Sequence, residues 1–232
     1  MMKKKIICIL ILLVLTISII FIVGAVTINR EEAIKLLDEN MLETSKNVRI
    51  IEKESGNSYE NYERETLKLD NIEYCRIKMT GEEDYNYINW IDLEAKKDIV
   101  VFINEKIYNS STLEVEPILI NYSEKAVEYF KDTSYEFEYV KKENVQNEKC
   151  AVLRAYKANE ADNNYEEMKV WVNMETGDCL KAEYFLNEKD FSKPEEPTSI
   201  LEFTYSYDSV KIEEIKEIKE EDYPDFKYTY LY

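Results

Sequence analysis

Residues 72–92 read IEYCRIKMTGEEDYNYINWID, and the alternation of side chains in this stretch decides the fold. Apolar residues recur at every second position before the polar link at residues 80–83, as in Cys75, Ile77 and Met79. A period of two is that of a strand whose successive side chains point to opposite faces of a sheet. The stretch therefore predicts two strands that pair as antiparallel neighbours across a short connection.

The same period extends in both directions along the chain. Short polar links separate the segments, which favours antiparallel neighbours throughout. Two prolines at positions 194 and 197 mark a loop, since prolines so close together do not fit a central strand. Strands are predicted at residues 48–54, 63–69, 72–80, 84–92, 98–103, 134–143, 149–157, 165–173, 179–186, 200–207 and 210–218.

Two helices are predicted to cover the sheet. Asn29, followed three residues later by Glu32, is typical of a capping box and predicts a helix over residues 30–44. A second helix over residues 122–131 follows from the spacing of its apolar residues, among them Val127 and Phe130. Each apolar stripe is expected to pack on the sheet.

The chain opens with an uncharged run at residues 6–28, preceded by three lysines at positions 3–5. A helix of that length reaches roughly 35 Å, enough to cross the hydrocarbon core of a bilayer. The lysines predict a cytoplasmic N-terminus and an extracytoplasmic remainder. We therefore expect residues 1–28 to form a cytoplasmic stub with a single-pass membrane anchor, and residues 29–232 to form one extracytoplasmic domain. A cleaved signal peptide is the alternative, because residues 23–25 resemble a small-residue cleavage site.

Charge and composition restrict the function. All 48 Asp and Glu residues follow the apolar run, together with all but three of the 30 Lys and Arg residues, so the domain is strongly acidic. An acidic surface argues against nucleic acid as a partner. The chain has no His, its few glycines do not form a phosphate-binding loop, and no S-x-x-K motif is present. We therefore expect neither an enzyme nor a bound metal or cofactor.

Three cysteines follow the apolar run, at positions 75, 150 and 179. Cys75 alternates with apolar residues, which predicts burial. If residues 149–186 form a three-stranded meander, Cys150 and Cys179 lie two strands apart, at about 10 Å. No strong disulfide framework is expected, and Cys150 to Cys179 is the bridge that this spacing disfavours least.

Aromatic residues repeat at every second position in several predicted strands, and each set faces one side of its strand. Core filling against a helix is one interpretation. The other is a concave apolar pocket, for which tyrosine is suited because its ring is apolar while its hydroxyl can form hydrogen bonds at the rim. The candidate pocket-lining residues are Tyr135, Phe137, Tyr139, Trp171, Phe203 and Tyr205.

The segment KVWVNMETGDCLKAEYF at residues 169–185 resembles a hairpin of the bacterial lipoprotein-localisation carrier superfamily. The Tyr-rich run from residue 203 to the motif YPDF at residues 223–226 looks like its membrane-anchored Gram-positive relatives. The resemblance implies a curved sheet closed by helices, with a concave apolar cavity for acyl chains or lipoproteins.

The expected fold class is therefore α+β, a transmembrane helix followed by a curved antiparallel half-barrel covered by two helices. The expected function is a membrane-anchored binding domain that holds an apolar ligand, either a lipid or an acyl chain. The alternative is an envelope protein-interaction or sensing module with a packed interior. The expected partners are the membrane, through residues 6–28, and a lipid or an envelope protein.

Overall fold

A computed structural model describes residues 27–56, 59–80, 85–112, 116–159, 164–188 and 192–231. Three α-helices and two 3-10 turns occur in this part of the chain: α2 (Arg30–Asp38), α3 (Met41–Thr44), α4 (Tyr122–Lys131), η1 (Ile212–Glu214) and η2 (Glu220–Asp222). The strands are β1 (Asn47–Gly56), β2 (Tyr59–Leu69), β3 (Ile72–Thr80), β4 (Tyr85–Asp92), β5 (Lys97–Phe102), β6 (Ile107–Ser111), β7 (Glu136–Val145), β8 (Glu148–Asn159), β9 (Asn164–Asn173), β10 (Cys179–Asn187), β11 (Ser199–Tyr207) and β12 (Lys227–Leu231).

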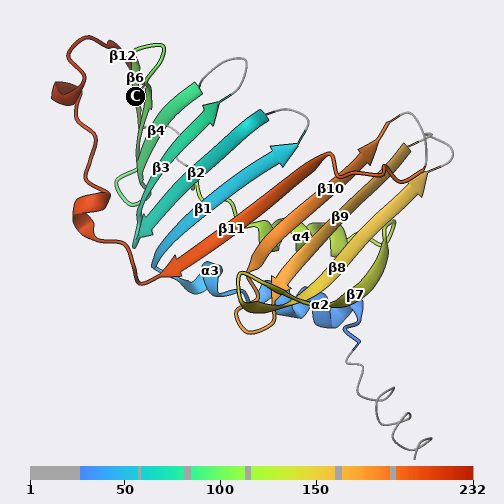
Figure 1. The fold of residues 1–232 in the computed structure, drawn as a ribbon. Coiled ribbons are helices and arrows are strands. Elements are labelled where there is room, and N and C mark those ends of the chain that lie inside the picture. Colours follow the sequence, from blue (N-terminus) through green and yellow to red (C-terminus); the bar gives the residue numbers. More distant parts are fainter. Residues whose placement is uncertain are drawn as a thin grey trace, which may run out of the picture.

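All twelve strands belong to one sheet, in the order β12-β6-β5-β4-β3-β2-β1-β11-β10-β9-β8-β7. Every neighbouring pair is antiparallel except β12 with β6, which is parallel. The sheet has two halves, one formed by β1–β6 with β12 at its edge and the other by β7–β11. They meet where β1 pairs with β11. Figure 1 shows the sheet curving across these two halves.

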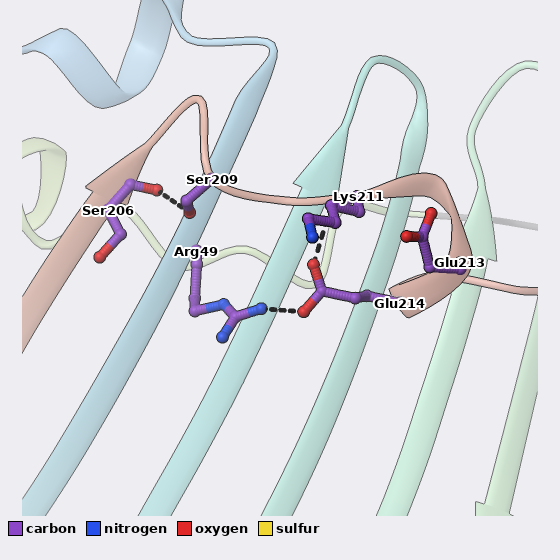
Figure 2. Close-up of a pocket in the computed structure, with 6 residues that line it drawn as sticks. All are labelled: Arg49, Ser206, Ser209, Lys211, Glu213 and Glu214. Carbon is purple, nitrogen blue, oxygen red and sulfur yellow. Dashed lines mark hydrogen bonds and ion pairs between the residues drawn. The ribbon is translucent and has the colours of Figure 1, made fainter.

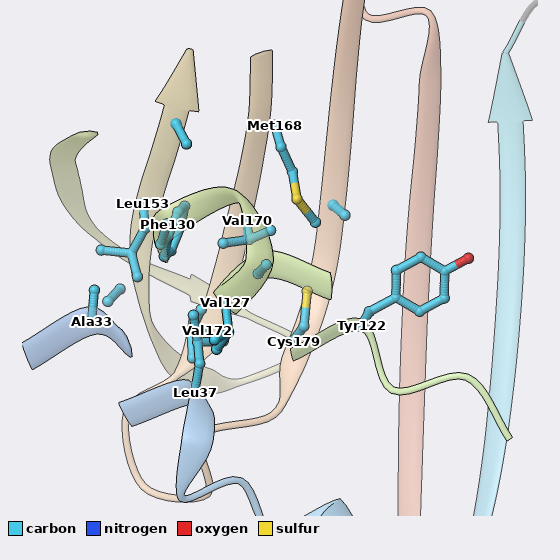
Figure 3. Packing of buried hydrophobic residues seen from close by; sticks show 14 of the residues in the cluster. Ala33, Leu37, Tyr122, Val127, Phe130, Leu153, Met168, Val170, Val172 and Cys179 are labelled. Atoms are coloured by element: carbon cyan, nitrogen blue, oxygen red, sulfur yellow. The ribbon is translucent and has the colours of Figure 1, made fainter. Parts of the chain in front are cut away.

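The helices lie on one face of the sheet, against the β7–β11 half (Figure 1). We call this the helix face. Under the helices, α2 and α4 bury Leu37, Val127 and Phe130 against Leu153 of β8 and Val170 of β9, as Figure 3 shows. This core also includes residues of β10 and β11 but, in the described chain, none of β2–β6.

The C-terminal segment crosses the opposite face, over the β2–β6 half, and we call this the tail face. Trp90 donates from Nε1 to the carbonyl oxygen of Ile215, at 3.0 Å, and the hydroxyl of Tyr108 donates to the carbonyl of Ile218, at 3.4 Å. Both side chains belong to an apolar cluster that includes Ile99 and Val101. The tail therefore closes a second core, on the side of the sheet away from the helices.

The hairpin turns follow from their Asx residues. Asn173 Oδ1 accepts from the backbone N–H of Glu175 at 2.8 Å, and Asp92 Oδ1 accepts from that of Glu94 at 3.0 Å. Gly177 has φ +73°, and a Cβ there would lie 2.2 Å from the carbonyl oxygen of Leu36. A glycine is thus required both for the turn and for the close approach of α2.

The expected fold class is wrong. The described chain is dominated by the large curved sheet, and its helices are short. The expected membrane-spanning run at residues 6–28 lies outside the described residues except for its last two positions, which are not helical. Nowhere in the described ranges is a helix both long and apolar enough to span a bilayer. The domain boundary at residue 29 and the extracytoplasmic location stay predictions.

Two expected elements also differ. The helix expected at residues 30–44 ends at Asp38, because Asn40 starts a separate turn by accepting from the backbone N–H of Glu43 at 3.0 Å. Residues 210–218, expected as a strand, form η1 and irregular chain. Here the apolar residues Val210 and Ile215 face the tail-face core without strand pairing.

Cys75, Cys150 and Cys179 are all free and buried. The meander expected at residues 149–186 is confirmed by the pairing of β8 with β9 and of β9 with β10. Cys150 packs with Trp171 in a separate apolar cluster on the tail face, whereas Cys179 lies in the core under the helices. The two thiols are thus on opposite faces, which explains why they do not form a bridge.

Candidate functional site

A continuous row of helix-face side chains runs across the sheet at the centre of the β1–β6 half. The strand registers pair Glu52 with Arg64, Arg64 with Ile77, Ile77 with Tyr87, and Tyr87 with Phe102. Directly paired residues point to the same face of a sheet. The row thus begins at the helices with two charged residues and continues outward as apolar and aromatic side chains.

The charged end of the row is buried. Arg64 Nη1 lies 3.9 Å from Glu52 Oε2, and the two side chains are 7% and 8% exposed. Arg64 also donates from Nε to the sulfur of Cys75, at 3.3 Å, and from Nη2 to the carbonyl oxygen of Ile118. The hydroxyl of Tyr122, the first residue of α4, donates to Glu52 Oε1 at 3.3 Å. We call Glu52, Arg64 and Cys75 the charged cluster.

Burial shifts the titration of this cluster. It raises the pKa of Glu52, and the opposing effects of the Arg64 charge and the Tyr122 hydrogen bond are smaller. Burial likewise raises the pKa of the Cys75 thiol, although Arg64 acts against the shift. At neutral pH this thiol is protonated and is a poor nucleophile. Its contacts indicate a structural role.

A second carboxylate anchors the chain that leads into α4. Glu73 is 2% exposed, and its Oε2 accepts from the backbone N–H groups of Ile118 and Leu119, at 2.7 and 3.0 Å. The segment before α4 is thereby held against β2 and β3 from both sides, by Glu73 and by Arg64. These contacts place residues 118 and 119 over β2 and β3.

Beyond the charged cluster, the helix face is apolar and partly exposed. We call this region the distal surface. Four of its side chains, from β2, β4 and β5, are half-buried, whereas Ile77 of β3 is only 5% exposed. It spans roughly 14 Å, the width of three inter-strand spacings. Its members are Tyr62, Ile77, Tyr87, Val100 and Phe102.

Most of the sequence-predicted pocket residues lie elsewhere, on the helix face of the β7–β11 half. Phe203 is 1% exposed, with its ring 4.4 Å from that of Tyr122. Phe137 packs edge-on against Phe130, with ring centroids 5.3 Å apart. Tyr139 is partly buried against the same helix core. These side chains fill the space beneath the helices.

The other three predicted residues have separate environments. Tyr135 lines a hollow of about 180 Å³ with Tyr129. The hydroxyl of Tyr205 donates to the carbonyl oxygen of Cys179, at 3.0 Å. Trp171 lies on the tail face, with the ammonium groups of Lys169 and Lys181 at 4.3 and 4.6 Å from its ring. The structure therefore does not bring the six residues into one pocket, and their ligand-binding role stays a prediction.

A larger hollow, of about 430 Å³, lies on the tail face next to the start of the C-terminal segment (Figure 2). Of its two cations, Arg49 forms ion pairs with Glu214 and, at 3.7 Å, with Glu65. Ser206, Ser209 and Lys211 complete a polar lining. The lining of this hollow is polar and charged, so it does not suit an acyl chain.

In the described part of the chain, no three His, Cys, Asp or Glu side chains are grouped in a way that could hold a metal ion. The charged cluster is hydrogen-bonded internally and has little contact with solvent. What the arrangement offers chemically is an apolar surface with polar groups at one end.

The charged cluster and the distal surface beside it were not predicted from the sequence, although a signal for the charged cluster exists. Along β1, the helix-face positions change from Val48 and Ile50 to Glu52, so an apolar alternation continues into a charge. An opposite charge at the paired position of the next strand, Arg64, would have indicated a buried pair. Register between strands is needed to see this, and periodicity alone does not supply it.

Neither a family model nor a curated protein sequence matches the chain. Among solved structures, it is similar to the lipoprotein LppX of Mycobacterium tuberculosis, at 8% identity and a TM-score of 0.43, over 78% of this chain and 97% of that one. It is also similar to a putative outer membrane lipoprotein-sorting protein domain from Vibrio parahaemolyticus, at 9% identity and a TM-score of 0.35, over 81% and 97%.

A third similar structure is a LolA superfamily protein from Nitrosomonas europaea, at 11% identity and a TM-score of 0.27, over 83% of this chain and 99% of that one. Similarity at this level says nothing about what this chain binds, and we argue its function from its own residues. Structures described as lipoprotein-sorting and LolA superfamily proteins are thus among those to which the chain is similar.

Proposed function

We propose that the domain is a non-catalytic binding protein that holds an apolar, chain-like ligand, such as a lipid acyl chain, on the distal surface. The observation that carries the proposal is the mismatch between the sheet and its cover. The apolar side chains of the helix face continue across β3, β4 and β5, whereas the core beneath the helices ends at β1, where Val48 and Ile50 pack against Leu42 of α3.

The exposure of these side chains supports the proposal. Tyr87 and Phe102 pair directly, with ring centroids 6.0 Å apart, and both remain half-buried. Transfer of each methylene group of a ligand from water to such a surface contributes about 0.8 kcal/mol. A chain of ten carbons that crosses the distal surface would therefore gain several kcal/mol from burial alone, before the cost of association.

The buried charged cluster sets the inner limit of this binding surface. The Glu52–Arg64 pair forms a polar boundary between the filled half under the helices and the distal surface. An acyl chain would not displace this pair, because separating two buried charges costs several kcal/mol. The ligand is thus expected to lie over β3–β5.

The alternative, a protein-interaction module with a packed interior, is favoured by the β7–β11 half. Phe130 and Phe203 are fully buried there, so the interior beneath the helices is filled by the side chains of the protein itself. The two functions differ in where a ligand can bind. Only the first requires that the distal surface takes up an apolar chain.

The test uses the full chain and a fluorescent C16 fatty acid, titrated in equilibrium binding experiments. Phe102→Lys places a charge on the distal surface and should weaken binding at least tenfold, which corresponds to about 1.4 kcal/mol. Asn104→Lys is the matched control, because it introduces the same single charge into the exposed β5–β6 turn nearby. Equal affinity of both variants, or no binding to the unmodified protein, would overturn the proposal.

A further inference from the structure

Two polar side chains lie within the otherwise apolar helix face of β4 and β5. Asn89 pairs with Cys75 on one side and with Val100 on the other, which places it one row from the Ile77–Tyr87–Phe102 row. Asp98 pairs with Ile91 and follows in the next row. Both therefore share the face and the strands of the distal surface.

Each of these side chains has a buried oxygen without a partner. Asn89 is 8% exposed, and its Oδ1 has no hydrogen-bond donor among the described residues; the same holds for Oδ1 of the half-buried Asp98. Leaving a buried acceptor unpaired costs about 1–3 kcal/mol, so two together on one face require an explanation.

Burial raises the pKa of Asp98, and the neighbouring Asn89 side chain partly offsets this shift. Both unpaired atoms are acceptors, so only a donor can satisfy them.

The charges nearby favour a donor that is positively charged. Within the described ranges, no ion pair involves Asp98. The adjacent Lys97 forms its ion pair with Glu217. Arg64 is held by Glu52, and Glu73 accepts from backbone N–H groups. The carboxylates on this face thus outnumber its cations, and Asp98 is the one that lacks a strong partner.

We propose that the apolar ligand carries a primary ammonium group, which Asn89 and Asp98 bind. This inference rests on the proposed function, since it names the polar end of the same ligand. An ammonium group has three donors, enough for both unpaired oxygens, and its charge compensates Asp98. A carboxylate or phosphate at this position would face two acceptors and a like charge.

The test compares three ten-carbon probes, decylamine, decanol and decanoate, by calorimetric titration of the full chain at pH 7, below their micelle-forming concentrations. The unmodified protein should bind decylamine at least tenfold more tightly than decanoate. Asp98→Asn should abolish most of this preference while leaving decanol unchanged. Glu105→Gln is the control, because it removes one exposed negative charge and should preserve the preference.

The outcomes separate this inference from the proposed function. Equal binding of all three probes, or an unchanged amine preference in Asp98→Asn, would overturn the ammonium site and leave the acyl-chain surface standing. Failure of every probe to bind would overturn the proposed function, and the ammonium site with it. If thermal unfolding shows that Asp98→Asn is not folded, Asn89→Ala tests the same site. This variant should weaken the binding of decylamine and leave that of decanol unchanged.

Discussion

Replacing Arg64 by Met removes the cation of the charged cluster and keeps much of the side-chain volume. Three groups then lose a donor: the Glu52 carboxylate, the Cys75 sulfur and the carbonyl oxygen of Ile118. The Glu52 side chain is only 8% exposed, so water does not easily replace the hydrogen-bond donors that Arg64 supplied. The variant is therefore expected to be strongly destabilised.

The expected loss is about 3–5 kcal/mol in the free energy of unfolding, the range for breaking a buried ion pair from one side. This is a large share of the 5–15 kcal/mol that stabilises a typical domain. The matched control is Lys53→Met. Lys53 pairs with Glu63 at 3.5 Å on the same two strands, one position further along, but the two side chains are 61% and 58% exposed. Its loss should not exceed about 1 kcal/mol.

Equilibrium unfolding in urea measures both variants, with the midpoint shifted and the slope unchanged if the native state keeps its compactness. Adding Glu52→Gln to Arg64→Met should recover part of the loss, because the uncompensated charge is then removed. Equal losses below 1 kcal/mol for Arg64→Met and Lys53→Met would refute the reasoning from burial.

Three further predictions concern pH, a turn and the tail. Burial raises the pKa of Glu52 above 4.5, so the folded state binds its proton more tightly than the unfolded state. Lowering the pH towards 4.5 should therefore stabilise the unmodified protein relative to Glu52→Gln, and a pH-independent difference in urea midpoints would contradict this. Gly177→Ala should lower the free energy of unfolding by at least about 1 kcal/mol, because a Cβ at φ +73° meets the carbonyl oxygen of Leu36. An unchanged melting temperature would contradict this, because it would mean that α2 shifts without loss of stability. Trp90→Phe removes the hydrogen bond to Ile215 and should lower the free energy of unfolding by about 0.5–1.5 kcal/mol. Amide hydrogen exchange across residues 212–218 should become faster. An unchanged exchange rate would show that this hydrogen bond does not hold the C-terminal segment in place.

Local signals in the sequence were sufficient to predict the helices whose ends are set by nearby residues. The helix predicted at residues 122–131 coincides with α4, and the capping box of Asn29 with Glu32 starts α2 as expected. The Asx turns at Asp92 and Asn173 likewise follow from side chains that bond to backbone two or three residues away. In each case the deciding interaction lies within a few residues.

Elements that depend on distant partners were missed. β6 contains Asn109 and two serines, a poor strand pattern, and it forms because β5 and β12 pair with it on both sides. β12 joins in parallel from about 120 residues away, which periodicity cannot indicate. The helix expected at residues 30–44 was drawn too long, because Asn40 fits a helical pattern and yet caps a new turn.

The distal surface was not identified from the sequence for a similar reason. Aromatic alternation identified side chains that face one side of a strand, but not which of them the helices would cover. Phe203 lies beneath α4, whereas Tyr87 lies beyond it, although both alternate in the same way. Distinguishing them requires the strand order, which places β11 within the helix-covered half and β4 four positions from β11.

The central claim, that an apolar chain binds on the distal surface, is tested most directly by photo-crosslinking. A C16 fatty acid with a diazirine at mid-chain is bound to the full protein, and the complex is irradiated. The attachment sites are then mapped by peptide mass spectrometry. Attachment should concentrate in β3, β4 and β5, at or beside Ile77, Tyr87 and Phe102, and an excess of unlabelled fatty acid should suppress it. Attachment confined to β7–β11, or spread over the chain without suppression, would contradict the account.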